Sequence, residues 1–396
     1  HGLIVGTTRS GKTNAAMFMV SQLARMGYDI IVLDWKNTWR KLLRMVDPNR
    51  VLIFTLAKND VAPLYANPLR PPVVRYHNDP RQRIVVPPSM WADVLAELFA
   101  YAYAPFPRSR SIVLEEIDNL YRQTGVYENH GDPRFTEYPT MSDLVDAVLR
   151  RLERVTPQVH GRGEIESINA IRSRLWEYRT PTRILNMEFG THRIGIPIER
   201  LYEGGRIVII EAFGLTGSHR QFLLSWLATG AYMYQMAVGR PRERPLLIVL
   251  EESQHLIPPQ TILEEVHIME SVWETMFREI GEYNIWLWAI AQVPSRLPIT
   301  VLGNTPFKLV FNLSSPSQQT KDADIMLEQL SLDPRWDHRH VKRFLTRLPP
   351  GQAVVRLPEF PRQEYGWPYL VQVPYIGFQF PFLGVYCCFT SWEKYH

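Results

Sequence analysis

One segment near the N-terminus constrains the fold more than any other. Residues 6–13 read GTTRSGKT, which matches in full the pattern of a phosphate-binding loop. The apolar run LIV precedes this segment, and the helix-like stretch NAAMFMVSQLARM follows it. A strand, a glycine-rich turn and a helix N-terminus together bind phosphate, because backbone N–H groups and the helix dipole face the same anion. Both flanks disfavour a chance glycine-rich turn, so the sequence predicts an α/β nucleotide-binding fold.

The loop residues differ in the chemistry that we expect from them. Lys12 supplies a point charge for the terminal phosphates, and Thr13 offers a hydroxyl to Mg²⁺. The expected cofactors are therefore ATP and Mg²⁺. The residues expected to bind the nucleotide are Gly6, Thr7, Thr8, Arg9, Ser10, Gly11, Lys12 and Thr13.

Short apolar runs recur along the chain and alternate with helical patterns. Such runs are typical of parallel strands that are covered on both faces by crossover helices. A long helix is predicted over residues 218–238, after a Gly-Gly turn and a strand. The predicted strands are residues 3–5, 29–34, 51–54, 206–211, 246–252, 286–292 and 307–312. These patterns predict an α/β fold with a mainly parallel sheet.

The pattern changes to helices between residues 86 and 190. Val113, Ile117, Leu120 and Tyr121 share one helical face, and Thr140 is placed to cap a helix that starts after it. We therefore expect a helical insertion lobe. The predicted division is a nucleotide-binding core at 1–85 and 191–375, the insertion at 86–190, and a C-terminal tail at 376–396.

Composition indicates a globular protein of the reducing interior. Of the 396 residues, 45% are hydrophobic, and the net charge of +4 permits a polyanionic partner without requiring one. The adjacent Cys387 and Cys388 cannot form a disulfide framework, and no signal peptide is present, so a cytoplasmic location is expected. The chain begins almost at its first core strand and lacks an initiator Met, so we expect a natural N-terminal portion to precede it.

The aromatic C-terminal segment is the nearest candidate for a membrane span. Residues 375–389 read YIGFQFPFLGVYCCF, but glycine and proline interrupt the run, and it is shorter than the 18 or so residues that a span needs. We therefore favour an extended tail docked on protein over a membrane helix.

Acidic and amide side chains end two of the predicted strands. Glu251 and Glu252 follow LLIVL, and Gln292 follows WLWAIA. Hydrolysis of a triphosphate needs a held metal and an oriented water. We expect Glu251, with Thr13, on the metal side, Glu252 as the general base, and Gln292 as the residue that senses the γ-phosphate or the water. The structural alternatives are surface acids on an edge strand and an amide that caps a strand end.

Ring-forming motors complete the site with an arginine from the next subunit. Arg220, Arg296 and Arg343 are candidates for that role, and Arg220 is the one assigned to the catalytic set. The sequence does not choose between them, and any single one of them is more often an ordinary surface arginine.

The motifs occur in an order that resembles one superfamily. These are GTTRSGKT, a strand ending in DWK, LLIVLEESQHL, IAQVPSRLP, GNTPFKLVFNLSSPSQQ and LPPGQAVVRLP. The set resembles the HerA/FtsK superfamily of hexameric DNA-pumping ATPases, whose core is RecA-like. The Asn67-Pro68-Leu69 turn and the helical insertion are more similar to the conjugation-type ATPases of type IV secretion and to the archaeal CedB-type DNA-import ATPases.

The resemblance implies a homohexameric ring with ATP at each subunit boundary and DNA in the central channel. A membrane channel component or a nuclease is an implied partner, and the cytoplasmic face of the membrane an implied place. Lys36, Arg40 and Lys41 are candidates for gripping DNA phosphates, with ordinary surface charge as the alternative. The sequence departs from the family pattern at Arg9, where glycine is usual, and at Glu251, where Asp is commoner.

Four functional hypotheses follow. The first is an ATP-driven DNA translocase for DNA transfer, import or conjugation. The second is a HerA-like helicase or translocase that processes DNA ends beside a nuclease. The third is a protein-secretion or pilus-assembly ATPase, which a channel lined with acidic and apolar residues would favour. The fourth, a nucleotide-binding regulator without turnover, is disfavoured by the intact Lys12, Thr13 and Glu252.

Overall fold

The computed structural model describes most of the chain, and every structural statement below concerns those residues. They are residues 1–58, 60–75, 83–103, 106, 108–156, 162–202, 204–313, 319–330, 338–357 and 369–374. The predicted C-terminal tail, 376–396, lies outside the described residues.

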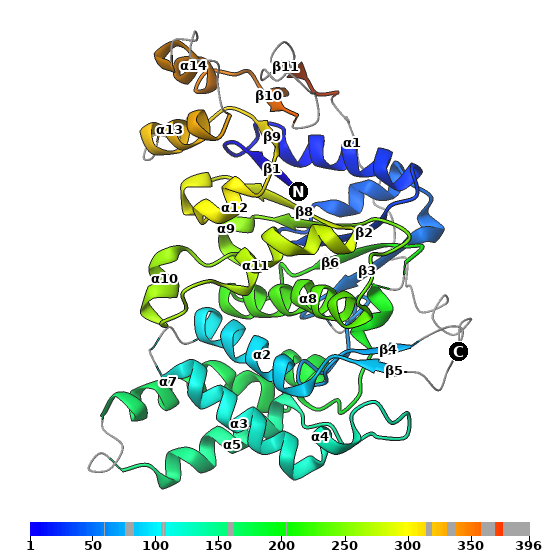
Figure 1. Cartoon of the computed structure of the whole chain (residues 1–396), viewed down its shortest axis with the longest axis vertical. Helices are drawn as coiled ribbons and strands as arrows, with labels where there is room; N and C mark the ends of the chain where they lie inside the picture. The colour runs from blue at the N-terminus through cyan, green and yellow to red at the C-terminus, as the bar shows by residue number, and fades with distance from the viewer. Residues whose placement is uncertain are drawn as a thin grey trace.

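A sheet of nine strands forms the centre of the molecule, in the order β11-β10-β9-β1-β8-β7-β2-β6-β3 (Figure 1). The pairings from β9 through to β3 are parallel, and only β10, which lies between β9 and the edge strand β11, runs antiparallel to its neighbours. This confirms the predicted α/β fold with a mainly parallel sheet. The strands are β1 Gly2–Val5, β2 Asp29–Asp34, β3 Val51–Thr55, β6 Ile207–Glu211, β7 Leu246–Glu251, β8 Ile285–Ala291, β9 Phe307–Val310, β10 Gln352–Arg356 and β11 Tyr369–Gln372.

Each face of the sheet is covered by different helices. Alternate residues of a strand point to opposite faces, so Ile30 and Val32 pack with α1 (Lys12–Arg25), whereas Ile31 and Leu33 belong to the cluster that contains α8 (Gly217–Val238). Strands β1, β2, β6 and β7 are buried along their whole length. Coverage on both faces explains why these strands read as continuous apolar runs.

The segment between residues 86 and 190 is helical, as expected, and lies at the end of the molecule away from α1 (Figure 1). The four residues predicted to share a helical face in α3 are all buried. Thr140 forms a capping box with Asp143 at the start of α5. The helices are α2 Pro88–Tyr103, α3 Ser109–Thr124, α4 Val126–Asn129, α5 Met141–Arg154 and α7 Arg162–Arg179, followed by the short π-helix η3 Asn186–Gly190.

One apolar cluster joins these helices to the sheet, since it contains residues of α2, α3, α5, α7 and α8 as well as of the strands. The nucleotide-binding part and the helical insertion therefore share one hydrophobic core. The predicted division of the chain into these parts and a tail stays a proposal. An antiparallel hairpin, β4 Val73–Arg75 with β5 Arg83–Val85, precedes α2 and was not predicted.

The remaining helices are short. They are α9 Ser253–Leu256, α10 Gln260–Glu265, α11 Val272–Glu279, α12 Ile299–Gly303, α13 Gln319–Leu330 and α14 His338–Leu345, with the 3₁₀ turns η1 Trp39–Arg44, η2 Pro48–Arg50, η4 Ile198–Leu201, η5 Ile280–Tyr283 and η6 Pro294–Arg296. None of the helices in the described part of the chain is long and apolar enough to cross a membrane.

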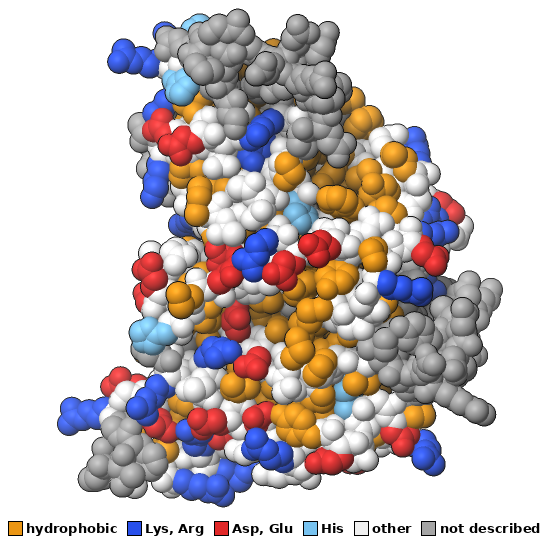
Figure 2. Space-filling model, in the orientation of Figure 1, with side chains coloured by type: hydrophobic (Ala, Val, Ile, Leu, Met, Phe, Trp, Pro, Cys, Tyr) orange, Lys and Arg blue, Asp and Glu red, His pale blue; other side chains and the backbone are white. Residues whose placement is uncertain are grey.

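The surface in Figure 2 carries Lys and Arg next to Asp and Glu, with hydrophobic side chains between them. This mixture agrees with the small net charge of +4. The face in view has no continuous basic area that would by itself indicate contact with a polyanion.

Glu97 links the helical segment to a helix of the core. It lies on α2, and its Oε1 accepts a hydrogen bond of 2.7 Å from the backbone N–H of Val272, the first residue of α11. Burial raises the pKa of Glu97 to about 7. The folded state therefore holds this proton at pH values where the unfolded chain has already released it.

We expect the ionisation of Glu97 to lower the free energy of unfolding as pH rises. The unfolded side chain ionises near its ordinary pKa of 4.5 and the folded one near 7, so stability is lost between these values and does not return at higher pH. Glu97→Gln keeps an oxygen for Val272 and removes the charge. Scanning calorimetry at pH 8 should give the variant a Tm about 3 °C above wild type.

At pH 5 that difference should be smaller. Glu128→Gln, at an exposed position of α4, serves as the control and should show no such trend. An equal Tm difference for Glu97→Gln at both pH values would contradict the account.

Candidate functional site

The phosphate-binding loop connects β1 to α1 and is held in a conformation that requires glycine. Gly6 has φ 151° and Gly11 has φ 115°, both in the range that L side chains rarely adopt. A Cβ at Gly6 would lie 2.6 Å from Cβ of Phe311 and 2.9 Å from Oγ of Ser10. Arg9 also has a positive φ, at 64°. The loop thus leaves no room for a side chain at Gly6.

Lys12 lies inside the curl of the loop. Its Nζ donates to the backbone carbonyls of Gly6, at 2.6 Å, and Thr7, at 2.8 Å, and the residue is 6% exposed. Burial lowers the pKa of Lys12 to about 8, and the nearby charge of Lys36 acts in the same direction. An amine with that pKa is mostly charged at neutral pH, so the loop presents a cation where an anion would bind.

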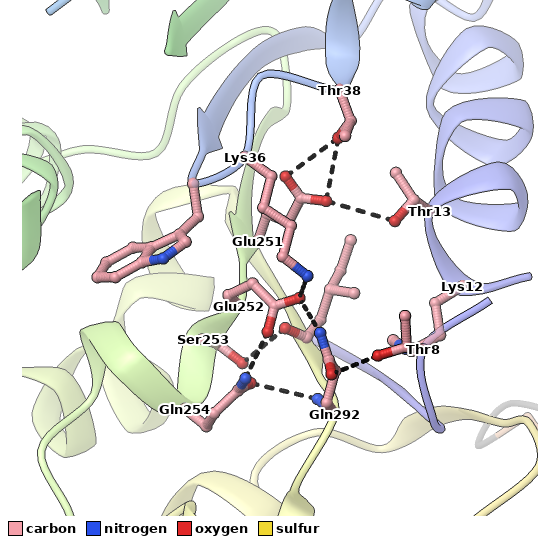
Figure 3. Close-up of polar contacts among 12 residues, drawn as sticks. Thr8, Lys12, Thr13, Lys36, Thr38, Glu251, Glu252, Ser253, Gln254 and Gln292 are labelled. Carbon is pink, nitrogen blue, oxygen red and sulfur yellow. Dashed lines mark hydrogen bonds and ion pairs between the residues drawn. The ribbon is translucent and has the colours of Figure 1, made fainter. Parts of the chain in front are cut away.

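Glu251, the last residue of β7, faces the loop (Figure 3). Its Oε1 accepts a 3.3 Å hydrogen bond from Oγ1 of Thr13, and both carboxylate oxygens lie within 3.3 Å of Oγ1 of Thr38. Burial, followed by the neighbouring carboxyl of Asp34, raises the pKa of Glu251 well above its usual value. A buried oxygen cluster of this kind suits a hard divalent cation.

Glu252 is the centre of a second set of contacts. Lys36 Nζ forms an ion pair with Oε1, which also accepts from Nε2 of Gln292, while Nε2 of Gln254 donates to Oε2. Burial alone would raise the pKa of Glu252, but the hydrogen bonds from Lys36 and Gln292 outweigh it and lower that pKa. Thr8 completes the set, because its Oγ1 donates to Oε1 of Gln292 at 2.8 Å.

Residues far apart in sequence therefore meet at the carboxyl edge of the sheet. The loop, the acids and the amide follow β1, β7 and β8, which are neighbours in the sheet. In the described residues, no group of three or more His, Cys, Asp or Glu side chains could hold a metal by itself. Mg²⁺ commonly binds through one or two protein oxygens and the substrate's phosphates. Thr13 and Glu251 fit that pattern.

Six predicted site residues thus lie in one place: Thr8, Lys12, Thr13, Glu251, Glu252 and Gln292. The sequence reasoning missed Lys36, Thr38 and Gln254 as members of the site. Asp34, the acid that ends β2, is the sequence signal that could have placed these residues in the site, because the carboxyl ends of the strands of a parallel sheet share an edge. The chain after Asp34 therefore lies near Glu251 and Glu252.

Two of the three basic residues predicted to grip DNA have other contacts here, and the role predicted for Lys41 stays a prediction. Lys36 pairs with Glu252, and Arg40 donates to both carboxylate oxygens of Glu211, at 2.6 and 2.7 Å. These contacts place both cations against buried acids and do not favour a role at a DNA backbone.

Arg220 is bound within its own chain. Its guanidinium donates to the backbone carbonyls of Trp35, Phe213 and Leu215 at 2.7 to 3.1 Å, and it lies 4.7 Å from the ring centroid of Trp35. These contacts fix the loops after β2 and β6. They favour an intramolecular role, and action on a neighbouring subunit stays a prediction.

Comparisons with known proteins place the chain in a family. The sequence profile of the family described as helicase HerA, central domain, matches residues 1–227. The fold is similar to VirB4 of Thermoanaerobacter pseudethanolicus, with a TM-score of 0.64 at 13% identity over 95% of this chain and 89% of that one. A search of curated proteins finds no match.

The fold is also similar to the plasmid coupling protein TrwB, a bacterial conjugative protein. Its complex with ADP and Mg²⁺ gives a TM-score of 0.63 at 12% identity, over 96% of this chain and 86% of that one. Its complex with the ATP analogue ADPNP gives 0.61 at 11% identity, over 94% and 85%. The family profile covers more than half of the chain. The matching solved structures and this chain share a RecA-like fold. The chain therefore belongs to the helicase HerA central-domain family and is a P-loop ATPase of the HerA/FtsK type.

Proposed function

We propose that this ATPase is a DNA translocase that acts as a hexameric ring in DNA transfer or import, in the manner of conjugation-type or CedB-type ATPases. The observation that carries the proposal is the joining of Lys12, Glu251, Glu252 and Gln292 at one sheet edge in a member of the HerA family. The similarity to TrwB, described as a plasmid coupling protein, supports the DNA-transfer class.

The cofactors of the proposed reaction are ATP and Mg²⁺. Lys12 and the backbone of the loop would hold the terminal phosphates, and oxygens of Thr13 and Glu251 would hold the metal. A bound Mg²⁺ would neutralise charge on the phosphates. The ADP and Mg²⁺ complex of TrwB supports the choice of these cofactors.

Glu252 and Gln292 are the residues proposed to act on the attacking water. Glu252 is ionised at neutral pH because its hydrogen bonds lower its pKa, so it can accept a proton. The amide of Gln292 can donate at one end and accept at the other, and here it links Thr8 of the loop to Glu252. That link gives the base a direct connection to the phosphate-binding loop.

The ring and the DNA channel are proposed from the superfamily. In ring-forming motors an arginine from the next subunit stabilises the charge of the transferred phosphate. The candidates for this role are still Arg220, Arg296 and Arg343. We favour Arg296 and Arg343 because the contacts of Arg220 lie within its own chain. A membrane channel component is the partner that fits the DNA-transfer hypothesis.

A second candidate function is favoured by the family match itself. The matching profile is that of helicase HerA, so a HerA-like helicase or translocase that processes DNA ends with a nuclease partner uses the same motor. The two hypotheses differ in the partner, and co-purification with a nuclease or with a membrane complex separates them.

Duplex DNA should stimulate ATP hydrolysis by ring-forming preparations of the chain. Lys12→Ala should abolish nucleotide binding and turnover together, because it removes the cation from the loop. Glu252→Gln should keep nucleotide affinity and lower kcat by about 100-fold or more, because general base catalysis is lost. A coupled phosphate-release assay with and without duplex measures these effects. Equal turnover under both conditions would count against DNA translocation.

Gly6→Ala should weaken nucleotide binding, while a matched glycine substitution should not. The new methyl group would meet Phe311 and Ser10, in a backbone conformation that alanine rarely adopts. Gly217→Ala is the control, because nothing lies within 4 Å of a Cβ at that position. Titration with a fluorescent ATP analogue should show affinity at least about 10-fold weaker for Gly6→Ala and unchanged for Gly217→Ala. Equal affinities would mean that the loop does not bind the phosphates.

A further inference from the structure

Lys36, in the loop after β2, forms an ion pair with Glu252. Its side chain is 43% exposed, whereas the side chain of Glu252 is 7% exposed. The lysine therefore approaches the buried carboxylate from the solvent side. Gln292 and Gln254 donate to the same carboxylate. Glu252 is thus held by donors on three separate segments.

The backbone that carries Lys36 is fixed by Asp34. The fully buried carboxylate of Asp34 accepts hydrogen bonds from the backbone N–H groups of Lys36, Thr38 and Trp39, at 2.7 to 3.0 Å. The turn also contains Asn37 with a positive φ of 62°. Lys36 thereby extends toward Glu252 while Thr38 extends toward Glu251 (Figure 3). One turn therefore contacts both acids.

An aromatic stack supports the same turn. Trp35 stacks on His255 with ring centroids 5.3 Å apart and an interplanar angle of 21°, and the guanidinium of Arg220 lies 4.7 Å from the Trp35 ring. His255 lies in α9, the short helix that follows Glu252. The backbone N–H of His255 donates to the carbonyl of Glu252 at 2.8 Å. The stack thus fixes the turn of Lys36 relative to the backbone of Glu252.

Glu252 itself has an unfavourable backbone conformation. Its φ of 53° and ψ of 44° lie in the left-handed region. A residue other than glycine stays there only where the surroundings determine its position, as happens at catalytic sites. Three side-chain donors and the stack supply those surroundings.

We propose that Lys36 is a positioning residue for hydrolysis, which aims the carboxylate of Glu252 through its ion pair and is itself held by the Asp34 turn and the Arg220–Trp35–His255 stack. This inference rests on the proposed role of Glu252 as general base. It assigns to Lys36 a function at the ATPase site in place of the DNA contact that the sequence suggested.

The test separates positioning from nucleotide binding. Lys36→Met keeps the length of the side chain and removes its charge, so kcat should fall at least about 10-fold while the Kd for a fluorescent ATP analogue changes less than about 2-fold. Lys36→Arg, which keeps the charge, should regain most of kcat. Lys321→Met, on the exposed side of α13, is the control and should match wild type.

A double-mutant cycle tests the contact itself. In the background of Glu252→Gln, Lys36→Met should have no further effect on kcat, because the base it positions is already lost. Trp35→Ala should lower kcat as Lys36→Met does, and Trp35→Phe should lower it less. Additive effects in the cycle, an unchanged kcat for Lys36→Met, or equal losses of kcat and nucleotide affinity would each overturn the inference.

Failure of the proposed function would look different. A wild-type chain without any ATP turnover would refute the proposed function. The cycle can then be followed through unfolding midpoints, where Lys36→Met should shift Tm only when Glu252 is intact. Independent Tm shifts would refute the Lys36 contact, whatever the activity of the wild type.

Discussion

The parallel pairing of β1, β8 and β7 is the constraint on which the site depends. In this register Val5 pairs with Ala291, and Ile290 pairs with Glu251. The residues that follow these pairs are therefore brought to one edge, which places the phosphate-binding loop, Glu252 and Gln292 beside one another. A one-residue shift in the pairing of one of these strands would turn the side chains of that strand to the other face. The register is thus as important to the chemistry as the residues themselves.

Burial on both faces of the sheet maintains that register. The central strands carry apolar side chains in both directions, and α1 covers one face while α8 belongs to the cluster on the other. Polar side chains lie where the strands end, and there they form hydrogen bonds within the protein. Asp34 and Glu251 are both almost fully buried, and each accepts hydrogen bonds at this edge. The apolar core therefore places acidic side chains in a partly dry site, where electrostatic interactions are strong.

The sequence was sufficient for the fold and for the residues at strand ends. The parallel sheet could be predicted because covered strands read as apolar runs, and Glu251, Glu252 and Gln292 could be grouped because strand ends share an edge. The direction of the Lys36 side chain could not be predicted, since it depends on the hydrogen bonds of Asp34 and on the left-handed Asn37. Nor could the intramolecular contacts of Arg220, which depend on how the loops after β2 and β6 approach α8. Side chains on turns are set by tertiary contacts that local patterns do not encode.

The central claim is that the edge formed by β1, β7 and β8 is the site where ATP is bound and split. The most direct measurement is a crystal structure of the chain with a non-hydrolysable ATP analogue and Mg²⁺. We predict that Nζ of Lys12 contacts the terminal phosphate and that Thr13 and Glu251 are the residues that hold the metal. A nucleotide bound elsewhere, or one whose phosphates do not contact Lys12, would contradict the account.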